Sequence, residues 1–164
     1  MGGPERMLCL WCPDWPVVTA RRRDPALAGV AVAVLGRGYV LSASSEARAG
    51  GVRRGLRKRE AEARCPGLVT VVSDPAAEGR AFEALAGVVE RLAPKLALDR
   101  PGLLFVPTRG PSRYHGGDTA LAARLAAEAE SAGVPEVRVG VADGTFAARL
   151  AARRAGPGDA VVVP

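Results

Sequence analysis

The chain has 164 residues, of which 48% are hydrophobic and 24% charged, and its formal net charge is +6 at pH 7. This length suits one domain, or a domain with a small appendage, and the composition excludes a disordered chain. No apolar run approaches the roughly 20 residues of a membrane span. The N-terminus lacks the apolar segment and cleavage site of a signal peptide. We therefore expect a cytoplasmic protein with no membrane partner.

The positive charge is concentrated in one part of the sequence. Only Lys58 and Lys95 are lysines, so nearly all basic residues are arginines. Residues 21–64 contain eleven basic residues against four acidic ones, and the rest of the chain is close to neutral. Such a segment is consistent with a nucleic acid or another acidic surface as partner.

The first 43 residues predict a strand, a short helix and a hairpin. The apolar run 7–12 indicates a strand, and a helix over 17–23 is expected to begin with Asp14 as its N-cap. Two further apolar runs, 30–35 and 39–43, flank a Gly-Arg-Gly spacer, which is a hairpin pattern.

A basic helical segment follows. Residues 44–67 are rich in small and basic side chains, and three glycines divide them into two short helices before Pro-Gly ends the pattern. A strand is expected at 68–72. Because the basic segment lies between two predicted strands, it is expected to form a small subdomain packed beside a sheet.

The second half predicts further helices and strands in alternation. Asp74-Pro75 is a strong helix start, and apolar residues recur at helical spacing up to residue 92. Later helices are predicted at 119–131 and 145–154, and strands at 96–98, 103–106, 137–141 and 160–163. Hairpins mixed with β-α-β units indicate an α+β fold, with a mixed sheet covered by helices on one face.

Cysteine and histidine are too few for a disulfide framework, and a zinc site would need all of Cys9, Cys12, Cys65 and His115. Cys9 and Cys12 have the spacing of a redox or metal half-site. They lie, however, in the run predicted to be a buried strand, so structural cysteines are the favoured interpretation. His115 is interpreted as a loop or helix-start residue rather than a catalytic base.

Candidate metal-binding carboxylates are scattered. A two-metal phosphoryl-transfer site needs several carboxylates that converge from neighbouring strand ends. The candidates Asp14, Asp99 and Asp143 include no adjacent pair, and helix caps or a turn explain them more simply. Gly140 to Gly144 forms a strand-to-helix turn without a Walker lysine, where close packing is the simpler explanation than phosphate binding.

The densest basic run is the strongest signal from the residues alone. Its cations repel one another, and contact with a polyanion would relieve that repulsion in a salt-dependent manner. A solvated, arginine-rich surface is the alternative. Aromatic residues that could stack on bases are sparse. The cations of this run are Arg53, Arg54, Arg57, Lys58 and Arg59.

Several segments in consistent order resemble a known family. Residues 8–15 resemble the first strand and motif of the Y-family (UmuC/DinB-type) translesion DNA polymerases, and 30–48 resemble the segment leading into their S-Y-E-A-R motif. Residues 51–68 resemble the sequence pattern of the family's fingers domain, "G-V-R-x-G-M … A-x-x-x-C-P-x-L". Residues 113–155 resemble the last elements of its palm domain. Overall the chain is most similar to the ImuB-type branch. The resemblance implies a ferredoxin-like polymerase palm (1–43 and 68–164) with a small helical fingers insert (44–67), and without the family's thumb and little finger.

The chain departs from the pattern of active family members at the metal-binding positions. Trp11 stands where they carry an aspartate in the first strand, and Pro13 at a second acidic position, with Asp14 displaced by one residue. The S-I-D-E carboxylate pair falls near Asp99 and Arg100, and its glutamate is missing. The degenerate site therefore comprises Trp11, Pro13, Asp14, Asp99 and Arg100.

The resemblance then implies a catalytically inactive, accessory or scaffold protein of DNA repair that has no catalytic residues, metal or cofactor. Nucleotide or DNA contacts are expected at Ser45, which replaces the motif's tyrosine, at Arg48 and in the basic run. DNA is the expected partner, bound weakly in this short form. By resemblance, further partners are a RecA-like accessory protein, an error-prone C-family polymerase and the sliding clamp.

Two alternatives remain open. The chain is a protein-interaction module with a palm-like fold and no DNA binding, or it is an active polymerase fragment that uses Asp14 and Asp99 with Mg²⁺ in an altered geometry.

Overall fold

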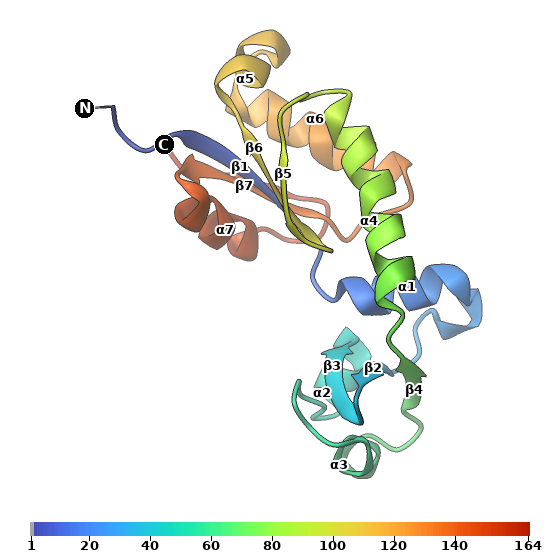
Figure 1. The fold of residues 1–164 in the computed structure, drawn as a ribbon. Coiled ribbons are helices and arrows are strands. Elements are labelled where there is room, and N and C mark those ends of the chain that lie inside the picture. The colour runs from blue at the N-terminus through green and yellow to red at the C-terminus, as the bar shows by residue number, and fades with distance from the viewer. Residues whose placement is uncertain (1) are drawn as a thin grey trace. The chain divides into compact units, whose positions relative to one another are not determined.

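The computed structural model describes residues 2–164, which form two compact units. The large unit contains the residues up to Pro13 together with Phe82–Pro164, and the small unit is Asp14–Ala81. The small unit is thus an insertion between the first strand of the large unit and the rest of it. Each unit has its own sheet (Figure 1).

The large unit is built on a five-stranded sheet in the order β5-β6-β1-β7-β8. Neighbouring strands run antiparallel except β7 and β8, which run parallel. The central strand, β1, pairs with β6 on one side and β7 on the other. The strands are β1 (Arg6–Trp11), β5 (Ala97–Arg100), β6 (Leu103–Pro107), β7 (Arg138–Asp143) and β8 (Ala160–Val162).

Helices cover both faces of this sheet. On one face, Met7, Cys9 and Phe105 form a core cluster with the alanines of α7 (Thr145–Arg154). On the other face Leu8 and Leu10 are fully buried, and α6 (Asp118–Ser131), which contacts β7 and β8, packs there. The predicted α+β class with a mixed sheet is confirmed, whereas coverage by helices on one face is corrected to both. Two further helices of the chain are α4 (Pro75–Glu90) and α5 (Arg109–His115).

Gly140 sets the approach of α7 to the sheet. A Cβ at this position would lie 2.1 Å from Ala152 N and 2.2 Å from Ala148 O, both of which are backbone atoms of α7. Only a glycine lets the strand and the helix backbone come this close. Gly140 therefore has a packing role, which agrees with the close packing expected for this strand-to-helix turn.

The small unit contains a three-stranded sheet in the order β3-β2-β4. β2 and β3 form the predicted hairpin, whose turn has Arg37 and Gly38 in the left-handed region (φ 54° and 82°). β4 joins β2 in parallel. The elements are α1 (Trp15–Arg23), a 3₁₀ turn (Pro25–Leu27), β2 (Val32–Gly36), β3 (Tyr39–Ala43), α2 (Ser45–Ala49), α3 (Lys58–Arg64) and β4 (Val69–Val72).

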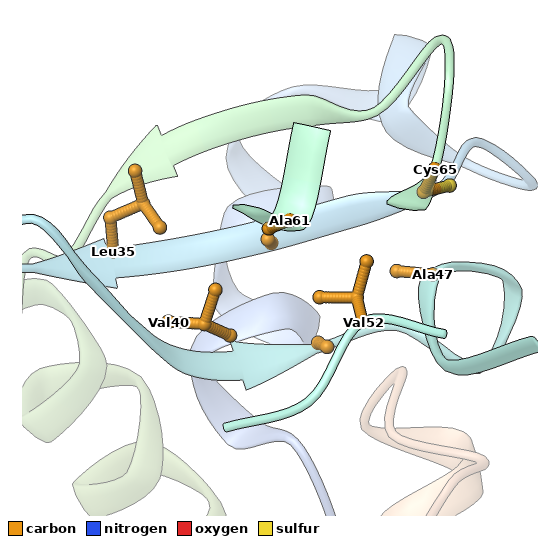
Figure 2. Close-up of a cluster of buried hydrophobic side chains, with 8 residues drawn as sticks. Leu35, Val40, Ala47, Val52, Ala61 and Cys65 are labelled. Carbon is orange, nitrogen blue, oxygen red and sulfur yellow. The ribbon is translucent and has the colours of Figure 1, made fainter. Parts of the chain in front are cut away.

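The two short helices are held to this sheet by a small apolar core (Figure 2). Leu35 and Val40 come from the hairpin, Ala47 from α2, Ala61 from α3, and Val52 from the loop between the helices. Because these side chains are small, the glycine-rich segment can pack closely. The outward-facing arginines are thereby fixed on an ordered surface.

A tryptophan joins the two ends of the small unit. Trp15 lies at the start of α1, is 2% exposed, and its Nε1 donates to Glu78 O at 2.9 Å. Glu78 lies in the first turn of α4, near the end of the unit. The predicted cap of α4 is also present, because Asp74 accepts from Ala77 N at 3.1 Å.

The unit boundaries differ from those expected. The hairpin and β4 form a sheet of their own, so residues 14–43 and 68–81 belong with the basic segment 44–67. The helix α5, rich in glycine, proline and arginine, was not predicted. Within residues 2–164, no helix is long and apolar enough to cross a membrane.

Substitution of Gly140 provides a stability test with a matched control. Gly140→Ala is expected to destabilise the protein by about 1–3 kcal/mol or more, because its Cβ would overlap the backbone of α7. Gly87→Ala, in an exposed part of α4 with nothing within 4 Å of its Cβ, is expected to stabilise it by about 0.5–1 kcal/mol. Urea denaturation measures both, and equal effects would contradict the close β7–α7 packing.

Candidate functional site

The predicted basic run forms part of an exposed cationic surface on the small unit, which we call the small-unit basic surface. Arg57, Lys58 and Arg59 line a shallow hollow of about 320 Å³ together with Arg37 from the hairpin turn. The Arg57 guanidinium lies 5.7 Å from the centre of the Tyr39 ring, which is 43% exposed. The structure thus joins an arginine from the hairpin and an aromatic ring to the predicted residues.

The other predicted DNA-binding residues lie around α2. Arg53 donates to Arg48 O and Val52 O at 3.0 and 3.1 Å, which holds its side chain along the loop. Ser45 is the first residue of α2 and its hydroxyl donates to Glu46. Arg54 is exposed. None of these side chains lines the Tyr39 hollow.

Asp14 is engaged by an arginine. Its carboxylate forms an ion pair with Arg48 and accepts from Ser42 at 3.3 Å. Arg48 also donates to Ala43 O. Asp14 stands at the N-cap position of α1 in the left-handed region (φ 56°), but its side chain makes no capping bond. The predicted capping role is therefore wrong, since the carboxylate turns to Arg48 instead.

A second ion pair supports α2 from α1. Arg21 donates to Glu46 at 2.9 Å and to the carbonyl of Val30 at 2.8 Å. The hydrogen bond from Arg21 and the backbone amide at the helix start lower the pKa of Glu46 to about 2. Glu46 is thus ionised at neutral pH and is not free to bind a cation.

Two residues of the predicted degenerate site, Trp11 and Arg100, lie on one row across the sheet of the large unit. Cross-strand register places Trp11 between Leu103 and Arg138, and Leu103 opposite Arg100. Directly paired residues project to the same face, so one face of the sheet end carries Arg100, Leu103, Trp11 and Arg138. We call this set the Trp11 row.

Arginines surround the ring of Trp11. The Arg138 guanidinium lies 5.7 Å from the ring centre, and that of Arg153, from α7, lies at 6.0 Å. Arg138 is also fixed by its bond to Ala155 O at 2.9 Å. Because arginine side chains are always charged at neutral pH, the row is cationic, and the indole ring attracts the two guanidinium groups that lie against it.

One carboxylate lies near the same face. Asp99 is the extra residue where the β5–β6 register shifts. Its charge helps to raise the pKa of Cys9, which lies two residues before Trp11 on β1 and on the same face, whereas the charge of Arg149 lowers that pKa. Asp143, at the end of β7, is paired with Arg6 at 3.3 Å instead. Within residues 2–164, no three His, Cys, Asp or Glu side chains gather into a possible metal site.

This donor set does not fit Mg²⁺. The ion prefers several carboxylate and water oxygens in octahedral geometry, whereas the Trp11 row offers one nearby carboxylate and several arginines. Asp14 belongs to the small unit, where Arg48 neutralises it. Pro13 ends the first segment of the large unit and brings no ligand.

The three cysteines are buried free thiols. Burial is the main cause that raises the pKa of both Cys9 and Cys12 to about 12. A thiol with so high a pKa is neither a nucleophile nor a ready metal ligand at neutral pH. This geometry supports structural cysteines.

His115 lies at the C-terminal end of α5 rather than at a helix start, and its Nε2 donates to Leu92 O at 3.2 Å.

The sequence did not indicate Arg138 and Arg153 as site residues. Strand register pairs Arg138 with Trp11, and the packing of α7 on the sheet brings Arg153 to the Trp11 ring. The spacing of these residues in the sequence indicates neither contact. Arg37 was likewise missed, because it lies in a turn remote from the basic run.

Comparison with known proteins gives consistent matches. The impB/mucB/samB family model matches residues 10–153. Protein ImuB of Caulobacter vibrioides (strain NA1000 / CB15N) is 36% identical over 114 residues, which are 70% of this chain and 24% of that protein. DNA polymerase IV 2 of Mesorhizobium japonicum is 36% identical over 145 residues, 85% of this chain and 34% of that protein. The chain thus spans about a quarter to a third of these relatives.

Solved structures share the fold. "Post-insertion binary complex of Dbh DNA polymerase" matches with a TM-score of 0.86 at 18% identity, covering 97% of this chain and 48% of that one. "Crystal Structure of DinB from Sulfolobus solfataricus" matches with a TM-score of 0.81 at 18% identity, covering 96% and 48%.

Thiol labelling tests the structural role of the cysteines. At pH 8 an aromatic disulfide reagent is expected to label none of the three thiols in the folded protein and all of them after denaturation, because the native thiols are buried and those of Cys9 and Cys12 stay protonated. Ser131→Cys, at the exposed end of α6, is the control and should add one rapidly labelled thiol. Rapid labelling of Cys9 or Cys12 in the native state would contradict this interpretation.

Proposed function

Since the chain belongs to the impB/mucB/samB family of Y-family polymerase-like proteins, we propose that it is a catalytically inactive member that binds DNA. In this proposal it acts as an accessory or scaffold in translesion synthesis and DNA repair. The large unit corresponds to the palm, and the basic segment 44–67 lies in the part that corresponds to the fingers. The proposal places the protein in the cytoplasm with its DNA.

The Trp11 row is the observation that carries the proposed inactivity. Active members, by resemblance, hold two metal ions with carboxylates from the first strand and the S-I-D-E segment. Here the corresponding sheet end carries Trp11 with Arg138 and Arg153 over its ring, and Arg100 one strand further along. Nucleotidyl transfer requires divalent cations to offset developing negative charge. A row of guanidinium groups opposes the binding of those cations.

The small-unit basic surface supports the proposed DNA binding. Arg37, Arg57, Lys58 and Arg59 gather around an exposed aromatic ring, and among the residues that the structure describes only Lys58 of these four has an ion-pair partner, Glu62 at 3.9 Å. Cations with few internal partners release counterions when they meet phosphates, which favours binding. Tyr39 offers one ring on which a base or sugar can pack.

The accessory role rests on similarity alone. One matched relative is named Protein ImuB, and another is named as a polymerase, DNA polymerase IV 2. The names alone therefore do not decide between an accessory and a catalytic role. By family resemblance, the partners of an inactive member are a RecA-like accessory protein, an error-prone C-family polymerase and the sliding clamp. A pull-down with each of these purified proteins tests the assignment.

Primer extension tests inactivity. The purified chain, in Mg²⁺ or Mn²⁺ with all four nucleotides, is expected to add no nucleotide to a primed template, because the Trp11 row excludes the metal ions. An active DinB-type polymerase assayed in parallel is the positive control. Robust incorporation that is lost in Asp99→Ala but kept in Glu83→Ala, an exposed acid on α4, would overturn the proposal and favour the active alternative.

A gel shift at several salt concentrations tests DNA binding. The triple variant Arg57→Ala/Lys58→Ala/Arg59→Ala is expected to bind primer–template DNA about tenfold more weakly, and the slope of log K against log salt should fall by up to about 0.9 for each lost phosphate contact. The matched control Lys95→Ala/Arg109→Ala/Arg113→Ala removes one lysine and two arginines from the large unit and should bind as the wild type does. Absence of binding even at low salt would favour the protein-interaction alternative.

A further inference from the structure

A second cationic surface lies on the large unit, outside the basic segment and outside the Trp11 row. An open groove of about 1,080 Å³ runs between the end of α4 and the short helix α5. Four exposed cations line it, namely Arg91, Lys95, Arg109 and Arg113. We call it the α5 groove.

These four cations have no ion-pair or hydrogen-bond partner among residues 2–164. Arg124 also lines the groove but is paired with Glu128 at 3.1 Å. Among the described residues that line the groove, Glu5 is the one acid. Like charges gathered without internal partners raise the local potential, and an anionic ligand lowers it.

The groove combines this charge with apolar surface. Leu92, Pro94, Pro107 and Pro111 contribute apolar lining. Tyr114 stands at the groove with 86% of its surface exposed. An exposed tyrosine beside arginines is the composition of a protein-interaction hot spot, where aromatic and arginine side chains dominate binding.

The two walls are held together by His115. Its Nε2 donates to Leu92 O at 3.2 Å, which ties α5 to the segment after α4. The Tyr114 ring packs edge-on against the His115 ring, with centroids 5.0 Å apart and an interplanar angle of 79°. The groove is therefore preformed, and little ordering of the protein opposes binding.

We propose that the α5 groove docks an acidic peptide segment of a partner protein that carries a short apolar anchor of one or two residues. Carboxylates of the peptide pair with the arginines, whose planar guanidinium groups bind them bidentately, while the anchor packs against Tyr114 and the prolines. A nucleic acid fits less well, because a single exposed ring cannot stack successive bases. The proposal does not depend on DNA binding by the small unit.

Fluorescence anisotropy with the full chain tests this assignment. The probe is a labelled 12-residue peptide of Asp and Glu around a central Leu-Phe pair. Saturable binding is expected, with affinity about tenfold lower for Lys95→Ala/Arg109→Ala/Arg113→Ala. Tyr114→Ser, which leaves the charge unchanged, should also weaken binding several-fold. The charge-matched control Arg22→Ala/Arg80→Ala/Arg154→Ala removes three exposed arginines that line neither basic surface, and it should bind the peptide as the wild type does.

Two further probes separate the possible outcomes. Replacing the Leu-Phe pair by serines should weaken binding, whereas a purely electrostatic surface would bind both peptides equally and overturn the anchored mode. Single-stranded DNA is the second probe. If the groove variant loses DNA affinity and the peptide does not bind, the surface is a nucleic-acid site and the proposal is wrong. Because the groove variant and the small-unit variant are each assayed with both peptide and DNA, failure here is distinguishable from failure of the proposed DNA binding.

Discussion

The antiparallel pairing of β1 with both β6 and β7 is the constraint on which the large unit depends. It fixes which residues face each other across the sheet, and so it places Trp11 between Leu103 and Arg138. A slip of one residue would exchange the two faces, and both faces are buried beneath helices, so the register is strongly specified. The contact of Gly140 with the backbone of α7 then brings Arg153 to the Trp11 ring. The chemistry of the row therefore follows from register and packing together.

The arginines of the molecule lie in two different environments. Around Trp11, the guanidinium groups lie against an indole ring and one of them is fixed to a backbone carbonyl, so they are part of the packing. Around Tyr39 and in the α5 groove they face solvent. Buried or packed charges mainly define what a site cannot bind, whereas exposed and unpaired ones attract a partner. This difference separates the proposed loss of catalysis from the proposed gain of binding.

Much of the fold could be predicted from the sequence because its signals are local. The hairpin around Gly36–Gly38, the Asp74 cap and the periodic helices were confirmed. Local sequence patterns do not predict features that depend on pairing between residues far apart in the sequence. The parallel β2–β4 pairing makes residues 14–81 one unit, although nothing in the hairpin or the strand alone indicates it. Likewise Asp14 looked like a cap, since its partner Arg48 lies 34 residues away in sequence.

The bond from Trp15 Nε1 to Glu78 O joins the two ends of the inserted unit. Because its two ends lie close together, the inserted unit spans the gap between β1 and the rest of the large unit as a short loop would. The five-stranded sheet therefore need not adjust to the unit inserted into it. The entropic cost of closing an inserted segment grows only slowly with its length. A change in the length or charge of the inserted unit therefore need not alter the pairing of β1 with β6 and β7.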